Sequence, residues 1–464
     1  MSTTDPHQAF VKALIDGVGQ DSVLTNDADV WAYGQDNSRK HSKPLAVVLA
    51  DNPEQAKTTV KLCYEHEVPL TVRGRGTGTA GGAIPASNGI VLSLERMDRI
   101  LRLDPANRFA QVQAGVLNQT VQDTVAENGF FWPPDPTSAA FCTVGGNVAV
   151  NSAGPRALKY GTTRDNVLGL KAITGTGDEI HTGVYTTKGV VGYDLTRLII
   201  GSEGTLAVVT EVTLKLVPLP ETTQLLQAVY RDIGSATSAI VAVMSQSNVP
   251  RSLEFMDAAS LEMVRNYSGA DLPHNAGAML LIEIDGSISS IDNMVETITS
   301  AASNDGLVKL SRASSKEEAD ALWATRKALS PALKNVAPNK LNEDVVVPVS
   351  NIPNLIQGLA DISQRFRIPI VNFGHAGNGN IHVNLLYDSQ DPEQGRQARP
   401  CLDQVFDLVL KLEGTLSGEH GIGMEKRDYI AREIDPVTLD LMRRVKRQFD
   451  PGNILNPGKI FPVA

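Results

Sequence analysis

A glycine-rich loop between two short apolar segments sets the strongest limit on the fold. The stretch RGRGTGTAGG, residues 73–82, follows a predicted strand at 68–72 and precedes another at 90–94. It contains Gly76-Thr-Gly78-Thr-Ala-Gly81, which matches the GxGxxG pattern of dinucleotide-binding folds. That pattern binds a dinucleotide where it opens a helix, but here Pro85 and a further strand follow. The sequence therefore excludes a Rossmann site, and no Lys-Ser/Thr pair completes a Walker A loop.

The same loop suits a phosphate-bearing ligand. Its glycines let the backbone come close to a ligand and present N–H groups to a phosphate. The alternative is a flexible linker, but linkers rarely join two short strands so closely. The apolar run upstream, residues 45–50, is followed by a helix start at Asn52-Pro53, with Gln55 at the third helical position.

Two further polar-glycine stretches follow the first loop. The segment 132–170 contains Gly145-Gly146-Asn147 and Asn151-Ser-Ala-Gly154, and GSEGT at 201–205 leads into a predicted strand at 206–217. Each stretch alone is typical of ordinary turns. Their concentration in one strand-rich region indicates a single large ligand wrapped by loops.

These motifs together carry a family resemblance. VRGRGTGTAGGAIP, PPDP with TVGGNVAVNSAG, and GSEGTLAVVTEV resemble the flavin-binding domain of the vanillyl-alcohol oxidase / p-cresol methylhydroxylase superfamily. The resemblance spans about residues 40 to 220 and implies a two-part α+β domain that binds FAD, with the pyrophosphate held by residues 73–82. We expect non-covalent FAD because no histidine lies in or beside that loop, although Cys142 lies in the flavin region. The flavin contacts that the resemblance implies are Arg73, Gly74, Arg75, Gly76, Thr77, Gly78, Gly81, Pro134, Gly145, Gly146, Asn147, Asn151, Gly154, Gly204 and Asn456.

The pattern changes after Pro220. Strands are predicted at 222–232, 278–286, 307–313 and 342–349, with helical stretches such as 287–303 and 314–330 between them. Strands alternating with long helices favour a sheet with helices packed on one face. We expect four parts: an N-terminal helical segment 1–40, an FAD-binding domain 41–220, a substrate-facing cap domain 221–410, and a C-terminal segment 411–464 that completes the active site and flavin site.

Two of the eight histidines flank one turn in FGHAGNGNIHVNLL, residues 373–386. His382 and Asn384 share one face of a predicted strand because side chains alternate. A turn at 377–380 brings His375 back toward His382. Neutral imidazoles held together favour a shared metal ion; the alternative is a polar hairpin with two surface histidines.

A carboxylate adds a third ligand. Glu419-His420 lies in SGEHGIG, where flanking glycines permit a bent backbone. Two histidines and one carboxylate suit Zn²⁺ or Mn²⁺ with open positions for substrate. The alternative is a glycine turn with solvated side chains, and the clustering of three candidate ligands favours the metal.

The motifs GHAGNGNIHVN, SGEHGIG and FDPGNILNPGKIF resemble the D-2-hydroxy acid dehydrogenase branch of that superfamily. This resemblance covers nearly the whole chain and implies a ferredoxin-like cap domain. It implies metal ligands at His375, His382 and Glu419, a general base at His420, a substrate-site polar residue at Asn384, and a substrate-carboxylate arginine at Arg326. From the sequence alone, Arg326 is equally compatible with an ordinary surface ion pair.

These roles are chemically consistent. Oxidation of a 2-hydroxy acid removes a proton from the hydroxyl group and a hydride from the α-carbon. A metal orients the hydroxyl and lowers its pKa, a histidine accepts the proton, and the flavin accepts the hydride. An arginine holds a carboxylate through two parallel hydrogen bonds.

The substrate is the least constrained part of the prediction. In D-2-hydroxyglutarate enzymes a lysine precedes the strand that here contains DVVVP. Lys340 lies near that position, but the spacing does not clearly match, and Glu343 and Asp344 add negative charge. We therefore expect D-lactate, with D-2-hydroxyglutarate or a glycolate oxidase subunit as alternatives. No second redox-centre motif occurs, so the acceptor is expected to be a quinone, a cytochrome or an electron-transfer flavoprotein.

Composition and charge limit the possible partners, cysteine-based sites and location of the protein. The net charge of −10 disfavours nucleic acid as a partner. Three scattered cysteines without CxxC disfavour a disulfide framework or an iron–sulfur cluster. No signal peptide or bilayer-spanning run is present, so we expect a cytoplasmic protein, membrane-associated only through its acceptor. The sequence does not determine the oligomeric state, and a homodimer is kept as one option.

Two functions of other classes remain open. A zinc hydrolase would use the same three ligands to activate water and would be colourless. A flavin-binding subunit without its own catalysis would lack the C-terminal ligand set, which this chain retains.

Overall fold

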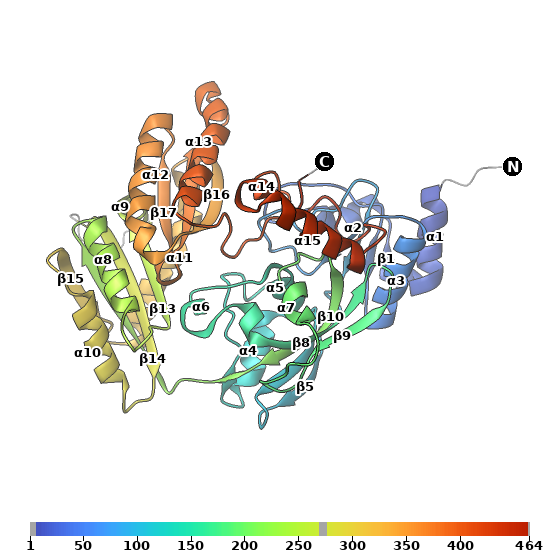
Figure 1. Ribbon diagram of the computed structural model, residues 1–464, viewed down its shortest axis with the longest axis horizontal. Coiled ribbons are helices and arrows are strands. Elements are labelled where there is room, and N and C mark those ends of the chain that lie inside the picture. The colour runs from blue at the N-terminus through green and yellow to red at the C-terminus, as the bar shows by residue number, and fades with distance from the viewer. Residues whose placement is uncertain (1–5, 269–275, 463–464) are drawn as a thin grey trace. The chain divides into compact units, whose positions relative to one another are not determined.

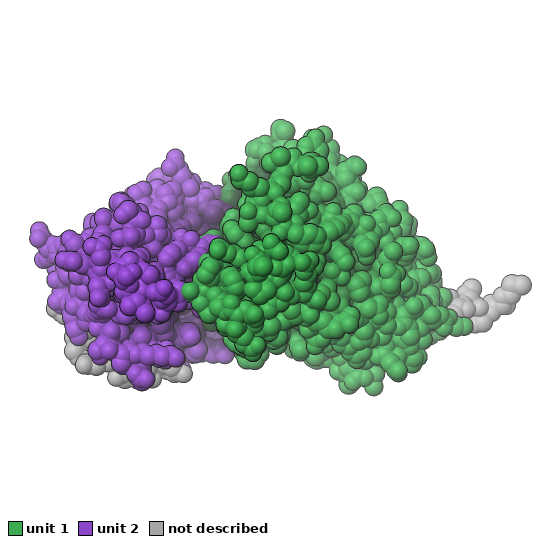
Figure 2. All heavy atoms as spheres, turned by 90° about the horizontal axis from the view of Figure 1, so that it is seen from below, with its two compact units in different colours: residues 1–154, 161–219, 419–464 green, residues 155–160, 220–418 purple. Residues whose placement is uncertain are grey.

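The computed structural model describes residues 6–268 and 276–462. The chain divides into two compact units (Figures 1 and 2). Unit 1 contains residues 1–154, 161–219 and 419–464, and unit 2 contains residues 155–160 and 220–418. Among the described helices, none combines the length and apolar composition needed to cross a bilayer.

The first sheet of unit 1 supports the glycine loop. Its strand order is β1-β2-β4-β3, with bounds Val23–Leu24, Val47–Leu49, Ile90–Ser93 and Leu70–Arg73. Strand β4 pairs in parallel with both β2 and β3, so residues 74–89 cross between parallel strands without a helix, as predicted. Helices α1 (Pro6–Val18) and α3 (Pro53–Glu65) pack on this sheet around a shared apolar core. The predicted start of α3 is confirmed, because Asn52 Oδ1 accepts from the Gln55 N–H at 3.0 Å.

The second sheet of unit 1 is antiparallel, with the order β5-β6-β10-β8-β9. The bounds are Ile100–Asp104, Phe109–Gln113, Ala207–Lys215, Val167–Thr174 and Glu179–Gly183. Helices α4 (Asn118–Ala126) and α5 (Val144–Val150) share its core. Shorter elements of this unit are α2 (Asp27–Trp31), α7 (Leu195–Ile199) and the strand pair β7 (Phe130–Phe131) with β11 (Val217–Pro218).

One prediction for this region was wrong. Gly145 and Gly146 were expected in a ligand-wrapping loop, but they lie in α5, where Thr143 Oγ1 caps the Gly146 N–H at 3.1 Å. A Cβ at Gly145 would lie 2.8 Å from Ala114 Cβ. Glycine at position 145 therefore lets α5 pack closely against Ala114, the residue that follows β6, and the sequence pattern alone does not distinguish that use from a loop.

The C-terminal segment completes unit 1. After α14 (Ile430–Glu433) and α15 (Pro436–Phe449), the chain runs beside β3. The Leu70 N–H donates to Ile454 O at 2.8 Å, and the Asn456 N–H donates to Leu70 O at 2.7 Å. Strand β3, which leads into the glycine loop, is thus held on both sides.

Unit 2 is built on one antiparallel sheet of seven strands, in the order β15-β12-β14-β13-β17-β18-β16. In chain order, their bounds are β12 Thr222–Tyr230, β13 Ser252–Asp257, β14 Ala278–Gly286, β15 Leu307–Arg312, β16 Asn339–Val346, β17 Ile370–His375 and β18 Asn380–Tyr387. The four strands and two helices predicted from the sequence are all present.

Helices cover both faces of this sheet, which corrects the expectation of one covered face. One face carries α8 (Ile233–Met244), α10 (Ile291–Ala302), α12 (Ile352–Phe366) and α13 (Pro392–Lys411). The other carries α9 (Ala258–Ser268) and α11 (Lys316–Ala332), whose apolar residues pack with Met256, Met279 and Phe373. The central strands β13 and β14 are buried along nearly their whole length, so each face needs a cover.

The register places the predicted site residues on the α9/α11 face. Glu254 pairs with His375, Phe373 pairs with His382, and Asp344 also pairs with His382. Because side chains alternate along a strand, these residues share a face with Asn384. Strand β16 begins at Asn339, earlier than predicted, so Lys340 lies within the strand and on the same face.

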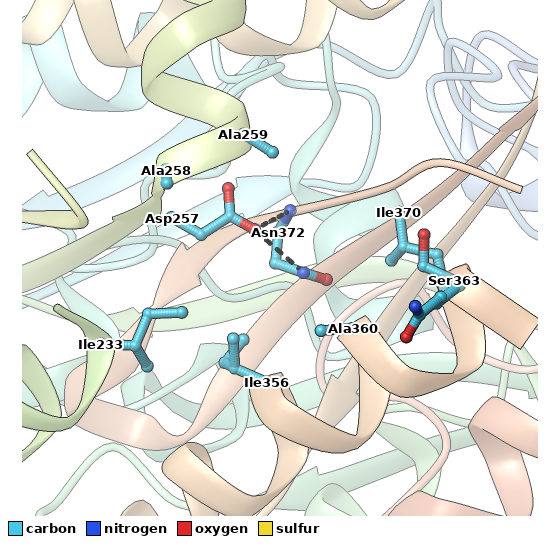
Figure 3. Close-up of a pocket in the computed structure, with 10 residues that line it drawn as sticks. Ile233, Asp257, Ala258, Ala259, Ile356, Ala360, Ser363, Ile370 and Asn372 are labelled. Atoms are coloured by element: carbon cyan, nitrogen blue, oxygen red, sulfur yellow. Dashed lines mark hydrogen bonds between the residues drawn. The ribbon is translucent and has the colours of Figure 1, made fainter. Parts of the chain in front are cut away.

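The opposite face holds a cavity of about 310 Å³ between β13, β17, α8 and α12 (Figure 3). Its lining includes Ile233, Ile356 and Ile370. Asp257 Oδ2 accepts hydrogen bonds from the backbone and side-chain N–H groups of Asn372, both at 3.0 Å, and Oδ1 accepts from the Ser260 N–H at 2.8 Å. The polar groups of this cavity therefore join β13 to β17 and cap α9.

Candidate active site

The histidine hairpin forms as the sequence predicts. Strand β17 ends at His375, a short turn Ala376–Asn378 follows, and β18 begins at Asn380. Gly379 has a φ of 74°, and a Cβ there would lie 1.9 Å from Val347 O, so this turn requires glycine. The two imidazole rings have centroids 5.3 Å apart at an interplanar angle of 83°.

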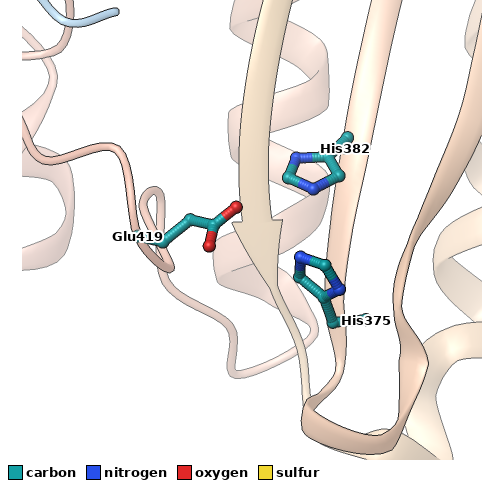
Figure 4. Close-up of side chains that lie close together, drawn as sticks. All are labelled: His375, His382 and Glu419. Carbon is teal, nitrogen blue, oxygen red and sulfur yellow. The ribbon is translucent and has the colours of Figure 1, made fainter. Parts of the chain in front are cut away.

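Glu419 joins the two histidines. One ligand atom from each of His375, His382 and Glu419 lies within 4.8 Å of the others. Figure 4 shows the rings on neighbouring strands and the Glu419 carboxylate directed toward them from a loop. All three side chains are partly exposed, which leaves room for a further ligand.

Asp344 fixes the backbone that leads to Glu419. The Gly418 N–H donates to Asp344 Oδ2 at 3.0 Å and to Asp344 O at 2.8 Å, and Ser417 Oγ donates to Asp344 Oδ1 at 3.2 Å. A Cβ at Gly418 would meet Asn380 Nδ2 at 2.6 Å. Gly418 is the last residue of unit 2, so the covalent bond to Glu419 brings that carboxylate to the hairpin.

Glu203 holds the chain on the other side of Glu419, within unit 1. Its carboxylate accepts from the Ile422 and Gly423 N–H groups, both at 2.7 Å. Burial raises the pKa of Glu203, and these two hydrogen bonds act in the opposite direction. Gly421, with a φ of 83°, makes the bend that follows His420. The sequence predicts a glycine turn here but does not reveal this carboxylate.

Glu254 is the other residue that the sequence did not reveal. It is 1% exposed and pairs across the sheet with His375. Its Oε1 lies 2.6 Å from His375 Nδ1, and its Oε2 accepts from Arg326 Nε at 2.9 Å and contacts Nη2 at 2.8 Å. Burial alone would raise the pKa of Glu254, but its contacts with His375 and Arg326 outweigh burial, so the pKa is lowered.

The remaining predicted catalytic residues occupy distinct positions. Arg326 is on α11, with its guanidinium 4.8 Å from the Phe373 ring centroid, and it is not a surface arginine because its side chain is 11% exposed. Buried Asn384 donates to Val371 O at 3.1 Å and accepts from Asn342 Nδ2 at 2.6 Å. His420 Nε2 lies 3.9 Å from Glu419 Oε1. Lys340 lies on the same face, two residues along β16 from Asn342.

The glycine loop fits a pyrophosphate. Asn37 bonds to the loop's carbonyl groups, since its N–H donates to Gly78 O at 2.9 Å and its Nδ2 donates to Thr77 O at 3.1 Å. Within the described residues, no backbone N–H of residues 75–82 donates a hydrogen bond. A Cβ at Gly78 would meet no atom within 4 Å, whereas one at Gly74 would lie 2.3 Å from Thr143 Oγ1. The loop therefore has backbone N–H groups without an acceptor in the described part of the chain and open space at Gly78, a donor set that suits a phosphate.

The N-terminal segment braces this loop. Arg73 Nη1 donates to Gln35 O at 2.5 Å, and the guanidinium lies 5.7 Å from the Tyr33 ring centroid. The Ala83 N–H donates to Asp36 Oδ2 at 3.3 Å. Arg75 contacts Glu95 at 3.5 Å. Both loop arginines thus have protein partners.

Several of the other predicted flavin residues make hydrogen bonds or turns within unit 1. Asn147 Nδ2 donates to Ser152 Oγ at 3.2 Å, and Asn118 Nδ2 donates to Pro134 O at 3.1 Å. Asn151 has a φ of 53° and ends α5. Gly154 packs against Asp135, and Gly204 has a φ of 70°.

Asn456 joins three segments that are far apart in the sequence. Its Nδ2 donates to Gly82 O at 2.9 Å and to Glu203 O at 2.7 Å, and its Oδ1 accepts from Thr71 Oγ1 at 3.2 Å. The glycine loop and the GSEGT turn are therefore joined through one C-terminal side chain.

Cys142 is buried, and burial raises the pKa of its thiol. Its Sγ accepts from Asn147 Nδ2 at 3.3 Å. A protonated, enclosed thiol is a poor nucleophile, which supports the expectation of non-covalent FAD.

Comparisons with known proteins agree with this architecture. Residues 44–183 match the family model of an FAD binding domain, and residues 219–460 match that of the FAD linked oxidases, C-terminal domain. Glycolate oxidase subunit GlcD of Bacillus subtilis is 38% identical over 449 residues, covering 97% of this chain and 96% of that protein. D-lactate dehydrogenase of Anaerostipes hadrus is 34% identical over 90% of both chains. The solved structure of p-cresol methylhydroxylase with substrate bound has a TM-score of 0.81 at 18% identity, covering 99% of this chain and 98% of that one.

Proposed function

The chain belongs to the FAD-linked oxidases and is an FAD-linked hydroxy acid dehydrogenase, and from this premise we propose that it oxidises D-lactate to the 2-oxo acid with a divalent metal. The observation that carries the proposal is the convergence of His375, His382 and Glu419, whose ligand atoms lie within 4.8 Å of one another. A flavin enzyme that transferred only a hydride would have no need of such a set.

The donor set fits Zn²⁺ or Mn²⁺. Two imidazole nitrogens and one carboxylate oxygen leave positions open for substrate. A metal held there supplies Lewis acidity, which lowers the pKa of a hydroxyl that it binds. His375 would bind through Nε2, because its Nδ1 faces Glu254.

We propose that FAD binds non-covalently in unit 1. The N–H groups of residues 75–82 would receive the pyrophosphate, and the other predicted flavin residues would line or support the site. Bound FAD supplies the hydride acceptor. The loop's open side at Gly78 supports this placement.

Arg326 would bind the substrate carboxylate. Two of its nitrogens, Nε and Nη2, face Glu254, whereas Nη1 makes no hydrogen bond within the described residues. That end of the guanidinium is available to a second carboxylate. His420 would accept the hydroxyl proton, and Asn384, which anchors β18 beside His382, would border the substrate.

A small monocarboxylate suits this arrangement. A dicarboxylate needs a second cation, and Lys340 is the residue on this face that would serve it. Asp344, four residues along the same strand, adds a carboxylate to that face. Glycolate is the second candidate, favoured by the 38% identity to glycolate oxidase subunit GlcD of Bacillus subtilis. Electrons would leave to a quinone, a cytochrome or an electron-transfer flavoprotein.

Anaerobic bleaching of the flavin absorption by single acids tests the proposal. D-lactate, L-lactate, glycolate, D-2-hydroxyglutarate and malate would be compared before and after chelation and metal restoration. Fast bleaching by D-lactate that is lost with chelator and regained with Zn²⁺ or Mn²⁺ is the expected result. If glycolate bleached the flavin faster than D-lactate, glycolate would be the better candidate substrate. If chelation did not change the rate of bleaching, the metal would have no part in the reaction.

A further inference from the structure

A buried carboxylate connects the proposed metal ligand to the proposed substrate arginine. Glu254 lies on β13, directly opposite His375 in the sheet register, and is 1% exposed. One carboxylate oxygen contacts His375 Nδ1 at 2.6 Å, and the other contacts Arg326 Nη2 at 2.8 Å. No sequence motif marks Glu254, since it lies more than 70 residues from both partners.

The contact with His375 determines which ring nitrogen serves a metal. A carboxylate accepts hydrogen bonds, so a neutral His375 carries its proton on Nδ1 and keeps the Nε2 lone pair for a cation. The hydrogen bond also fixes the plane of the ring and raises its basicity as a ligand. His375 is the last residue of β17, and this contact holds its ring at the end of the strand.

The contact with Arg326 compensates the charge of the Glu254 carboxylate, which is buried in the sheet. A buried charge without a partner destabilises the fold strongly, and Arg326 supplies the compensating cation. Phe373 covers the guanidinium on one side, 4.8 Å from its ring centroid. Arg326 would therefore bind two carboxylates: that of Glu254 through Nε and Nη2, and that of the substrate through Nη1.

We infer that Glu254 is a positioning residue that fixes the His375 ring for the metal. Through the same carboxylate, the affinity for the metal depends on the Arg326 guanidinium. This inference rests on the proposed function, because it presumes that His375 binds a metal. Outer carboxylate partners of ligating histidines typically change metal affinity by about 10- to 100-fold.

The test measures zinc affinity by chelator competition on the FAD-loaded protein, without substrate. Glu254→Gln keeps the size of the side chain and removes its charge, and it should weaken Zn²⁺ binding about 10- to 100-fold. Asp257→Asn is the matched control: it changes a buried carboxylate on the same strand but on the opposite face. That control should leave the zinc dissociation constant within about twofold of wild type while it lowers the melting temperature.

A double-mutant cycle tests the coupling. The effect of Arg326→Gln on zinc affinity should differ by at least about fivefold between the wild-type and Glu254→Gln backgrounds. Additive effects would overturn the coupling, and a Glu254→Gln protein that binds zinc as tightly as wild type would overturn the positioning role. If Glu254→Gln does not fold, Glu254→Asp replaces it, since a shortened carboxylate should also loosen the site.

Failure of the inference is distinguishable from failure of the proposed function. A wild-type protein that binds no zinc or manganese contradicts the proposed function itself. A wild-type protein that binds metal, with affinity unchanged by Glu254→Gln, contradicts only the inference.

Discussion

The glycine loop of unit 1 and the histidine hairpin of unit 2 present candidate ligand-binding groups in opposite ways. The loop offers backbone N–H groups from residues 75–82, with open space at Gly78, and the side chains of Arg73 and Arg75 brace it. The hairpin offers two imidazoles, and Glu419 adds a carboxylate from a loop. Two of these three groups are held through buried acidic residues: Glu254 contacts His375, and Asp344 binds the backbone just before Glu419. A backbone site depends on chain geometry, whereas a side-chain site depends on neighbours that hold each ligand in one rotamer.

The largest expected effect is on the rate of flavin reduction, and it distinguishes the histidine hairpin from the glycine loop. His382→Ala removes one of three proposed ligands and should lower the rate of flavin reduction by more than the roughly 100-fold that an outer partner contributes. Bound FAD and its absorption should not change. Metal content by atomic absorption and anaerobic stopped-flow reduction measure the two outcomes.

His181→Ala is the control for that variant, because His181 is an exposed residue of β9 in unit 1. Loss of FAD from the His382→Ala protein would contradict the separation of backbone and side-chain sites.

His420→Gln should have the next largest effect. Removal of a general base slows the chemical step by about 10²- to 10⁴-fold, while the three ligands and the flavin remain. Metal affinity and the rate of flavin reduction would be measured on the same preparation, so that an effect on the chemical step can be told apart from loss of the metal. A parallel loss of metal would mean that His420 acts through its neighbour Glu419 and not on the substrate.

Gly78→Ala tests the backbone site with a smaller change. The added Cβ meets no protein atom within 4 Å, so the apoprotein should keep its melting temperature. A ligand against the loop would meet that Cβ, and FAD affinity should fall by about tenfold, or about 1.4 kcal/mol. FAD titration of the apoprotein measures it.

Gly395→Ala in α13 is the control, since its Cβ would have only one ordinary contact, at 3.5 Å. Unchanged FAD affinity in Gly78→Ala would place the cofactor elsewhere in unit 1.

The smallest expected effect is a pH dependence of unit 1. Burial lowers the pKa of Lys459 to about 8, and its Nζ donates to Ile84 O at 2.6 Å. Between about pH 8 and the ordinary lysine value, the unfolded chain binds more protons than the folded one. The free energy of unfolding of the apoprotein should therefore rise with pH in this window, by less than about 1.4 kcal/mol per pH unit.

Lys459→Met should flatten that rise in urea unfolding series at several pH values. A steeper dependence in the variant would show that Lys459 is stabilised as a cation. The metal site should show no matching change, because Lys459 acts on the loop's support.

Local patterns were sufficient to predict much of the fold. The helix start at Asn52, the strands around the glycine loop, and the strands and helices of unit 2 each depend on residues close in sequence, and all are present. The hairpin was predictable for the same reason, since Gly379 and strand alternation fix His375 and His382 within eight residues. The exceptions were Gly145 and Gly146, which packing drew into a helix, and the second helical layer on the sheet.

What the sequence by itself determined is therefore the set of groups that could perform chemistry, because ligands and turn glycines lie in short continuous motifs. The tertiary structure decided what holds those groups. Glu254 meets His375 across 121 residues, Glu203 meets Gly423 across 220, and Asn456 meets Gly82 across 374. Sheet register and chain return create these contacts, and hydrogen bonds between distant segments leave no periodic signal in the sequence.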